Sequence, residues 1–88
     1  MRNKLATTIQ LSLYGRPDCH LCEDMQAGLQ DYAEQLGFVV DIIDIDEDPA
    51  LLSQFGAKVP VLMHGSHEIC HYFLDPKALQ MYFSETLE

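Results

Sequence analysis

The chain has 88 residues, 48% of them hydrophobic, and a formal charge of −9 from 14 acidic and 5 basic side chains. This length and composition indicate one small globular domain, which we place at residues 1–88. The acidic balance argues against nucleic acid and anionic membrane surfaces as partners, because both require clustered Lys and Arg.

The first regular element is expected at residues 9–14, where apolar and polar side chains alternate as in a strand. Residues 15–18 (Gly-Arg-Pro-Asp) break this alternation. From Cys19 to Leu36, apolar side chains recur at spacings of three and four, which is typical of an amphipathic helix. Gly37 is expected to end this helix, as glycine does just after the last helical residue.

Residues 38–45 (FVVDIIDI) are apolar at nearly every position, which predicts a strand covered on both faces, as in parallel pairing. Asp48 and Pro49 then predict the N-cap and the first residue of a second helix. Gly56 is expected to end this short helix. Its inward-facing apolar residues are expected to be Leu51, Leu52 and Phe55.

Residues 59–63 and 69–73 have the composition of strands, and a short turn at residues 64–67 joins them, which predicts a hairpin. Asp75 and Pro76 repeat the N-cap and proline device at the start of a last helix. The apolar face of that helix is predicted to consist of Leu79, Tyr82, Phe83 and Leu87.

The resulting element order is β-α-β-α-β-β-α. A strand–helix–strand opening implies a right-handed crossover with the first two strands parallel. The later hairpin adds antiparallel strands. We therefore predict an α/β domain with a four-stranded mixed sheet flanked by helices on both faces.

The cysteine count bears on the compartment. The chain has three cysteines, no signal-peptide pattern and no apolar run near the roughly 18 residues of a membrane helix. These features predict a cytoplasmic, reducing location without membrane association. There, a Cys-x-x-Cys pair is more often catalytic or metal-binding than a structural staple.

Such a pair is formed by Cys19 and Cys22, at the start of the first predicted helix. The first N–H groups of a helix have no intrahelical partners and form a partially positive end, which lowers the pKa of a thiol placed there. The thiolate is the attacking form in disulfide exchange. Arg16 is a neighbouring cation that is expected to favour the thiolate of Cys19, and His20 is expected to do the same when it is charged. Asp18 opposes them if its charge lies close to the sulfur.

Two alternatives for this pair stay open. Zinc or iron–sulfur ligation through Cys19 and Cys22 is one, although a structural zinc site needs four ligands and no second paired motif is present. We therefore assign no metal site. A non-catalytic binding module is the other alternative. The other side chains that could serve as metal ligands are His20, His64, His67, Cys70 and His71.

Two segments carry a family resemblance. YGRPDCHLC at residues 14–22 resembles the active-site entry of glutaredoxins and thioredoxins, and KVPVL at residues 58–62 resembles the segment that opens their third strand. The Cys-His-Leu-Cys pair is similar to that of small bacterial glutaredoxin-like proteins. The resemblance implies a thioredoxin-like fold, a nucleophilic Cys19, a resolving Cys22 and a cis peptide bond before Pro60 beside the sulfurs. It also implies that the backbone of Val59 pairs with an extended substrate.

The function implied by the resemblance is thiol–disulfide exchange with a protein or small-molecule disulfide, by a monomer that needs no bound cofactor. Glutathione or a thioredoxin reductase system would reset the pair. Glutathione-using glutaredoxins carry a Gly-Gly pair after the fourth strand, and residues 69–75 lack it. They also usually carry Thr or Ser where this chain has Val59. Glutathione is therefore not expected to bind in the usual pose, and it stays one of two candidate reductants beside a thioredoxin reductase system.

Overall fold

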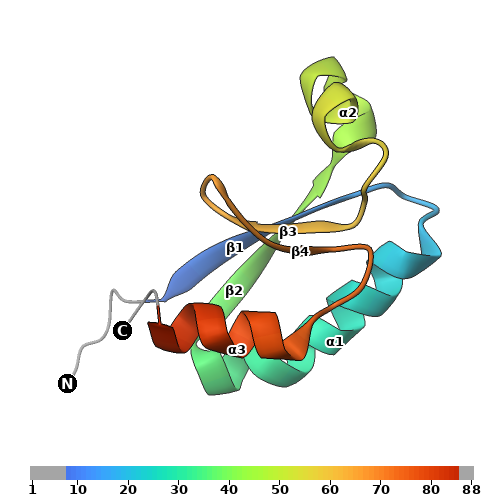
Figure 1. Cartoon of the computed structure of the whole chain (residues 1–88). Coiled ribbons are helices and arrows are strands. Elements are labelled where there is room, and N and C mark those ends of the chain that lie inside the picture. The colour runs from blue at the N-terminus through green and yellow to red at the C-terminus, as the bar shows by residue number, and fades with distance from the viewer. Residues whose placement is uncertain (1–7, 86–88) are drawn as a thin grey trace.

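The computed structural model describes residues 8–85. Its elements follow the order β-α-β-α-β-β-α with one added turn of 3₁₀ helix, which confirms the predicted α/β class (Figure 1). Leu87, predicted on the last helix, lies outside the described residues, as do both ends of the predicted domain. The elements are β1 (Ile9–Gly15), α1 (His20–Leu36), β2 (Phe38–Asp44), η2 (Ile45–Glu47), α2 (Pro49–Phe55), β3 (Val61–His64), β4 (His67–His71) and α3 (Pro76–Glu85).

The four strands form one mixed sheet in the order β2-β1-β3-β4. β1 and β2 are parallel, with Ile9 opposite Phe38 and Gly15 opposite Asp44. β3 is antiparallel to both β1 and β4. Because parallel neighbours need a crossover connection, α1 has to lie on one face of the sheet between β1 and β2. This brings the start of α1 to the carboxyl end of β1.

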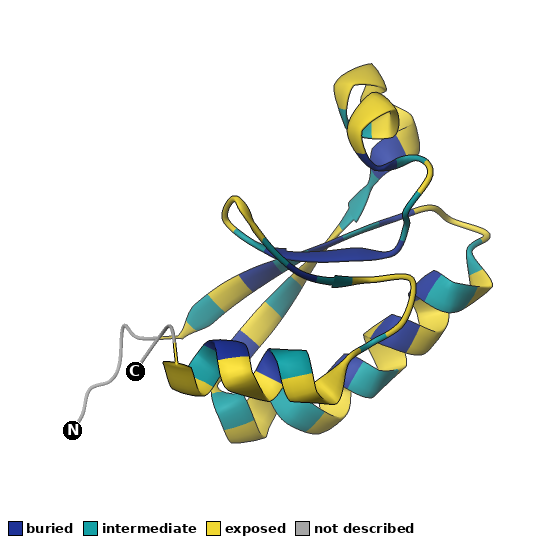
Figure 2. Cartoon of the chain, viewed as in Figure 1, coloured by how far each residue is buried: buried dark blue, intermediate teal, exposed yellow. Residues whose placement is uncertain are grey.

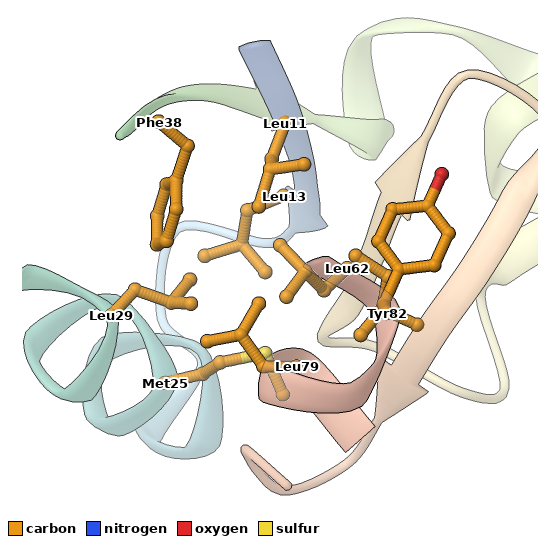
Figure 3. Close-up of a cluster of buried hydrophobic side chains, with 9 residues drawn as sticks. Leu11, Leu13, Met25, Leu29, Phe38, Leu62, Leu79 and Tyr82 are labelled. Carbon is orange, nitrogen blue, oxygen red and sulfur yellow. The ribbon is translucent and has the colours of Figure 1, made fainter. Parts of the chain in front are cut away.

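The main core lies between one face of the sheet and helices α1 and α3. In Figure 2, the buried residues of both helices lie on the sides that face the sheet. Figure 3 shows side chains from β1, β3, α1 and α3 meeting in this layer. The cluster consists of Leu11, Leu13, Met25, Leu29, Phe38, Leu62, Ile69, Leu79 and Tyr82.

A smaller cluster lies on the opposite face, under α2 (Figure 1). Phe55 is 4% exposed, and its ring stacks on Tyr14 at a centroid distance of 4.5 Å. Ile45, Val61 and Met63 complete the buried part of this cluster. Helices therefore cover both faces of the sheet, as predicted from the element order.

The prediction that residues 38–45 are covered on both faces is wrong. β2 is an edge strand, and Val39 and Ile42 are 51% and 49% exposed. Its parallel pairing with β1 is as predicted, but α2 packs over only one end of the sheet. Leu52, which is predicted to face inward, is 39% exposed. Its helix, α2, has only 7 residues and presents a narrow face to the sheet.

The hairpin differs from the prediction in its boundaries. β3 begins at Val61 instead of Val59, since Pro60 has no N–H to contribute to the sheet. β4 spans His67–His71 and ends before Tyr72, whose φ of 68° lies in the left-handed region. A tyrosine rarely adopts this conformation, so the chain leaves the sheet at a point that the strand-like composition of residues 69–73 does not reveal.

Candidate active site

Cys19 is the N-cap of α1. Its backbone is extended, with φ −94° and ψ 111°, and its Sγ accepts a hydrogen bond from the backbone N–H of Cys22 at 3.0 Å. A serine, threonine or aspartate oxygen usually has this capping role. The sulfur of Cys19 therefore lies at the partially positive end of a helix of 17 residues.

Cys19 and Cys22 are joined in a disulfide, with their Cα atoms 5.1 Å apart. The two residues differ in exposure: Cys22 is buried, at 8% exposure, whereas Cys19 is half-buried. A reagent in solution therefore reaches the sulfur of Cys19 first.

Gly15, at the end of β1, lies against the buried cysteine. A Cβ atom at Gly15 would lie 2.9 Å from Cys22 Sγ and 3.3 Å from Cys22 Cβ. Only glycine permits this approach of the strand to the cysteine side chain. In the sequence, Gly15 indicates only the break after a strand, because its contact with Cys22 depends on how the following loop folds back.

Arg16 lines the same cavity as Cys19, and its guanidinium forms an ion pair with a carboxylate. Arg16 Nε donates to Asp46 Oδ1 at 2.9 Å. In the sequence, Asp46 belongs to an acidic run that is typical of a solvated edge and turn, so its pairing with Arg16 is not predicted. The run consists of Asp41, Asp44, Asp46, Glu47 and Asp48. His20, the other residue expected to modulate the thiolate, is exposed at the first position of α1.

Val59 and Pro60 lie on the segment before β3. The peptide bond between them is cis, and Pro60 is buried while Val59 is half-buried. Val59 and Cys19 line one cavity of about 390 Å³. The fold therefore brings together two segments that are forty residues apart in the chain, from Cys19 to Val59.

Contacts from β4 and Tyr72 hold this segment in place. Tyr72 donates its backbone N–H to Pro60 O at 2.9 Å and its hydroxyl to Ala57 O at 2.9 Å. Lys58 Nζ donates to Glu68 Oε1 at 2.5 Å. None of these three contacts is evident from the sequence, because nothing in the local pattern links residues 57–60 to β4 and the residue that follows it.

Two titratable groups near this segment are perturbed. The hydrogen bond from Lys58 holds the pKa of Glu68 below its usual value, with His71 contributing in the same direction and burial opposing. Burial raises the pKa of the Cys70 thiol, and a backbone hydrogen bond from Asp75 opposes the rise. Cys70 is thus a half-buried, weakly acidic thiol in an edge strand.

Within residues 8–85, no three side chains of His, Cys, Asp or Glu lie close enough together to hold a metal ion. His67 and His71 are exposed, whereas His64 is half-buried, with its Nδ1 2.5 Å from Tyr82 Oη.

None of the helices within residues 8–85 is long and apolar enough to cross a membrane.

Sheet order, helix placement and the position of the Cys-x-x-Cys pair define the class of protein. The structure is similar to thioredoxin 1 from Thermosipho africanus, with a TM-score of 0.61 over 91% of this chain and 100% of that chain. The structure of a malarial protein gives a TM-score of 0.62 over 93% of this chain and 100% of that chain. Their sequence identities of 17% and 16% support the fold alone. The protein has a thioredoxin fold.

The family follows from sequence. Residues 10–84 match the glutaredoxin-like domain (DUF836), and the chain belongs to this family. A protein from Nitrosomonas europaea has 37% sequence identity to this chain. Its NMR structure gives a TM-score of 0.79 over 93% of this chain and 98% of that chain. A crystal structure of a protein from X. campestris is 31% identical, with a TM-score of 0.64 over 84% and 95%. No curated protein matches the chain.

Proposed function

We propose that this protein is a thiol–disulfide oxidoreductase in which Cys19 is the nucleophile and Cys22 the resolving thiol. One observation carries the proposal. Cys19 is the more exposed residue of the pair, and its sulfur caps α1 and accepts a hydrogen bond from the backbone N–H of Cys22. This environment stabilises negative charge on Cys19, which is the property that an attacking and leaving thiolate needs.

The reaction begins with the reduced protein. The Cys19 thiolate attacks one sulfur of a substrate disulfide, the substrate S–S bond breaks, and the released thiolate takes up a proton. Cys22 then loses its proton and attacks the Cys19 sulfur of the mixed disulfide, which releases the second substrate thiol. Two electrons have passed from the protein to the substrate, and the Cys19–Cys22 disulfide has formed.

Val59 is proposed to position the substrate. It precedes Val61, the first residue of β3 that pairs with β1, so its backbone groups lie outside the sheet ladder. It also lines the cavity beside Cys19. An extended substrate segment can therefore pair with the backbone of Val59 while its disulfide lies at Cys19. Pro60 holds this segment at the site, and Arg16 and His20 modulate the thiolate.

The cycle closes when an external dithiol or two glutathione molecules reduce the Cys19–Cys22 disulfide. We propose glutathione or a thioredoxin reductase system for this step, in a cytoplasmic monomer. The exchange itself uses only sulfur atoms of the protein and its partners, so the proposal includes no metal or nucleotide cofactor.

The test is the reduction potential of the Cys19–Cys22 pair, measured in a Cys70→Ser background by equilibration with glutathione buffers and mass analysis of trapped thiols. We expect a reversible two-thiol couple between roughly −150 and −300 mV, the range of known exchange proteins. Cys19→Ser should abolish reduction of a disulfide substrate, whereas Cys22→Ser should trap one mixed disulfide. Thiols that never form the intramolecular disulfide would instead support a binding module.

A further inference from the structure

The cavity beside Cys19 has a charged lining. It measures about 390 Å³, which is in the range of small-ligand pockets. Two carboxylates, those of Asp18 and Asp46, lie there with a single guanidinium. The lining residues are Arg16, Pro17, Asp18, Cys19, Asp46 and Val59.

Basic side chains next to this cavity are already paired. The guanidinium of Arg16 is bound to Asp46 at 2.9 Å, and the ammonium of Lys58, which precedes Val59, is bound to Glu68 at 2.5 Å. Asp18 is exposed and directly precedes Cys19. The space beside the accessible sulfur therefore has a net negative charge.

The negative charge continues on the other side of Arg16. A second cavity, of about 400 Å³, includes Cys22 in its wall and is lined by Glu23 and Asp44 as well as by Arg16. Acidic side chains therefore outnumber basic ones in both cavities that adjoin the disulfide. A cationic group that approaches either sulfur gains attraction, and an anionic group is repelled.

We infer that the preferred substrate is a polypeptide disulfide with Lys or Arg next to its reacting half-cystine, and that Asp18 and Asp46 select it. This inference rests on the proposed function, because it names the substrate class of the same reaction. A segment paired with the backbone of Val59 places the side chains that flank its half-cystine close to Cys19 and its acidic cavity. Oxidised glutathione, which is net anionic, is repelled at the same place.

The expected size of the effect follows from Coulomb's law. Two opposite charges about 7 Å apart change a rate constant about threefold at the dielectric constant of bulk water and low ionic strength, and the lower effective dielectric near a protein surface makes the change larger. Screening weakens this effect, because the Debye length is about 8 Å at physiological ionic strength and about 3 Å at 1 M salt. Selectivity for a cationic substrate should therefore decrease as salt is added.

The experiment uses the full chain with Cys70→Ser, reduced beforehand and freed of reductant. Three disulfide-linked homodimers of the capped peptide Gly-X-Cys-X-Gly serve as probes, with Lys, Gln or Glu at both X positions. Formation of the Cys19–Cys22 disulfide is followed in a single turnover by acid quenching, alkylation and mass analysis. Each rate constant is divided by that of the same peptide with dithiothreitol, a neutral dithiol, which removes differences in intrinsic reactivity.

We expect the Lys peptide to react at least tenfold faster than the Glu peptide at low ionic strength, with the Gln peptide between them. Asp18→Asn and Asp46→Asn should each reduce the ratio of Lys to Glu rates about threefold or more. Asp31→Asn is the matched control, since Asp31 is an exposed residue farther along α1 and changes the net charge equally. It should leave the ratio unchanged, and circular dichroism checks that each variant is folded.

Equal normalised rates for the three peptides, or an equal effect of Asp31→Asn and the two site variants, would overturn the inference while leaving the exchange reaction intact. Failure of all three peptides, the neutral one included, to oxidise the pair would show that the proposed function itself is wrong. The inference would then fall with it.

Discussion

Gly15 and Cys22 lie so close together that a Cβ atom at position 15 would be 2.9 Å from the sulfur of Cys22. Strand β1 therefore forms one wall of the site, and the buried cysteine packs directly on its last residue. The contact limits what can replace Gly15, because both Sγ and Cβ of Cys22 would have to move.

Gly15→Ala is expected to destabilise the protein by about 1–3 kcal/mol, the usual range for overpacking a tight interior contact. Gly28→Ala is the matched control. Its added Cβ also meets an atom at 2.9 Å, but that atom is Cδ2 at the end of the Leu74 side chain, which can rotate away. Because alanine also favours the helix, Gly28→Ala should be neutral or stabilising. Urea unfolding of both variants measures the difference, and equal effects would contradict this account.

Tyr72→Phe tests whether the segment before β3 is held from the end of β4. The change removes the hydroxyl that donates to Ala57 O and keeps the backbone N–H that donates to Pro60 O. We expect a loss of about 0.5–1.5 kcal/mol in the free energy of unfolding, as for one hydrogen bond. Hydrogen exchange at Lys58 and Val59 should become faster than in the parent protein. Unchanged exchange there would mean that the hydroxyl does not restrain the segment.

The contact between Lys58 and Glu68 predicts a pH dependence. Lys58 lowers the pKa of Glu68 in the folded protein, so the carboxylate contributes stability above its unfolded pKa of about 4.3. That contribution is lost as the pH falls through the lower, folded pKa. Since both side chains are partly exposed, we expect only about 0.5 kcal/mol at neutral pH.

Glu68→Gln should therefore reduce the free energy of unfolding near neutral pH, and the difference from the parent protein should vanish below the folded pKa. Lys58→Met should have a similar effect at neutral pH. Lys77→Met, which removes the same charge from an exposed site on α3, is the control. A difference that persists in acid, or that Lys77→Met reproduces, would assign the effect to something other than the ion pair.

Cys70 and Cys19 should differ in reactivity. Burial raises the pKa of the Cys70 thiol, so its thiolate is scarce at pH values where an ordinary cysteine, with a pKa of about 8.5, already reacts. The reduced protein should be alkylated at Cys19 well below that pH and at Cys70 well above it. Iodoacetamide labelling across pH with peptide mass analysis gives both profiles. Identical profiles in the native protein would contradict the effect of burial, and the denatured protein provides the reference.

Several features of the protein are determined by local sequence alone. The alternation in residues 9–14 forms β1, and the three-and-four spacing from Cys19 to Leu36 forms α1. Gly37 adopts a φ of 81° after α1, and Asp48 and Asp75 cap the next two helices through Ala50 N–H and Ala78 N–H. Each of these depends on residues a few positions apart, which is why the element order is confirmed. The glutaredoxin-like class is predicted instead from the resemblance carried by residues 14–22 and 58–62, and the family match over residues 10–84 confirms it.

The tertiary structure decided the rest. Whether an apolar strand such as residues 38–45 is central or at an edge depends on which strands pair, and β2 became an edge strand with Val39 exposed. The approach of Gly15 to Cys22 and the contact of Lys58 with Glu68 join segments that no local pattern connects. Local periodicity reports the preference of a segment for helix or strand, whereas packing across the sheet determines which side chains meet at the cysteine pair.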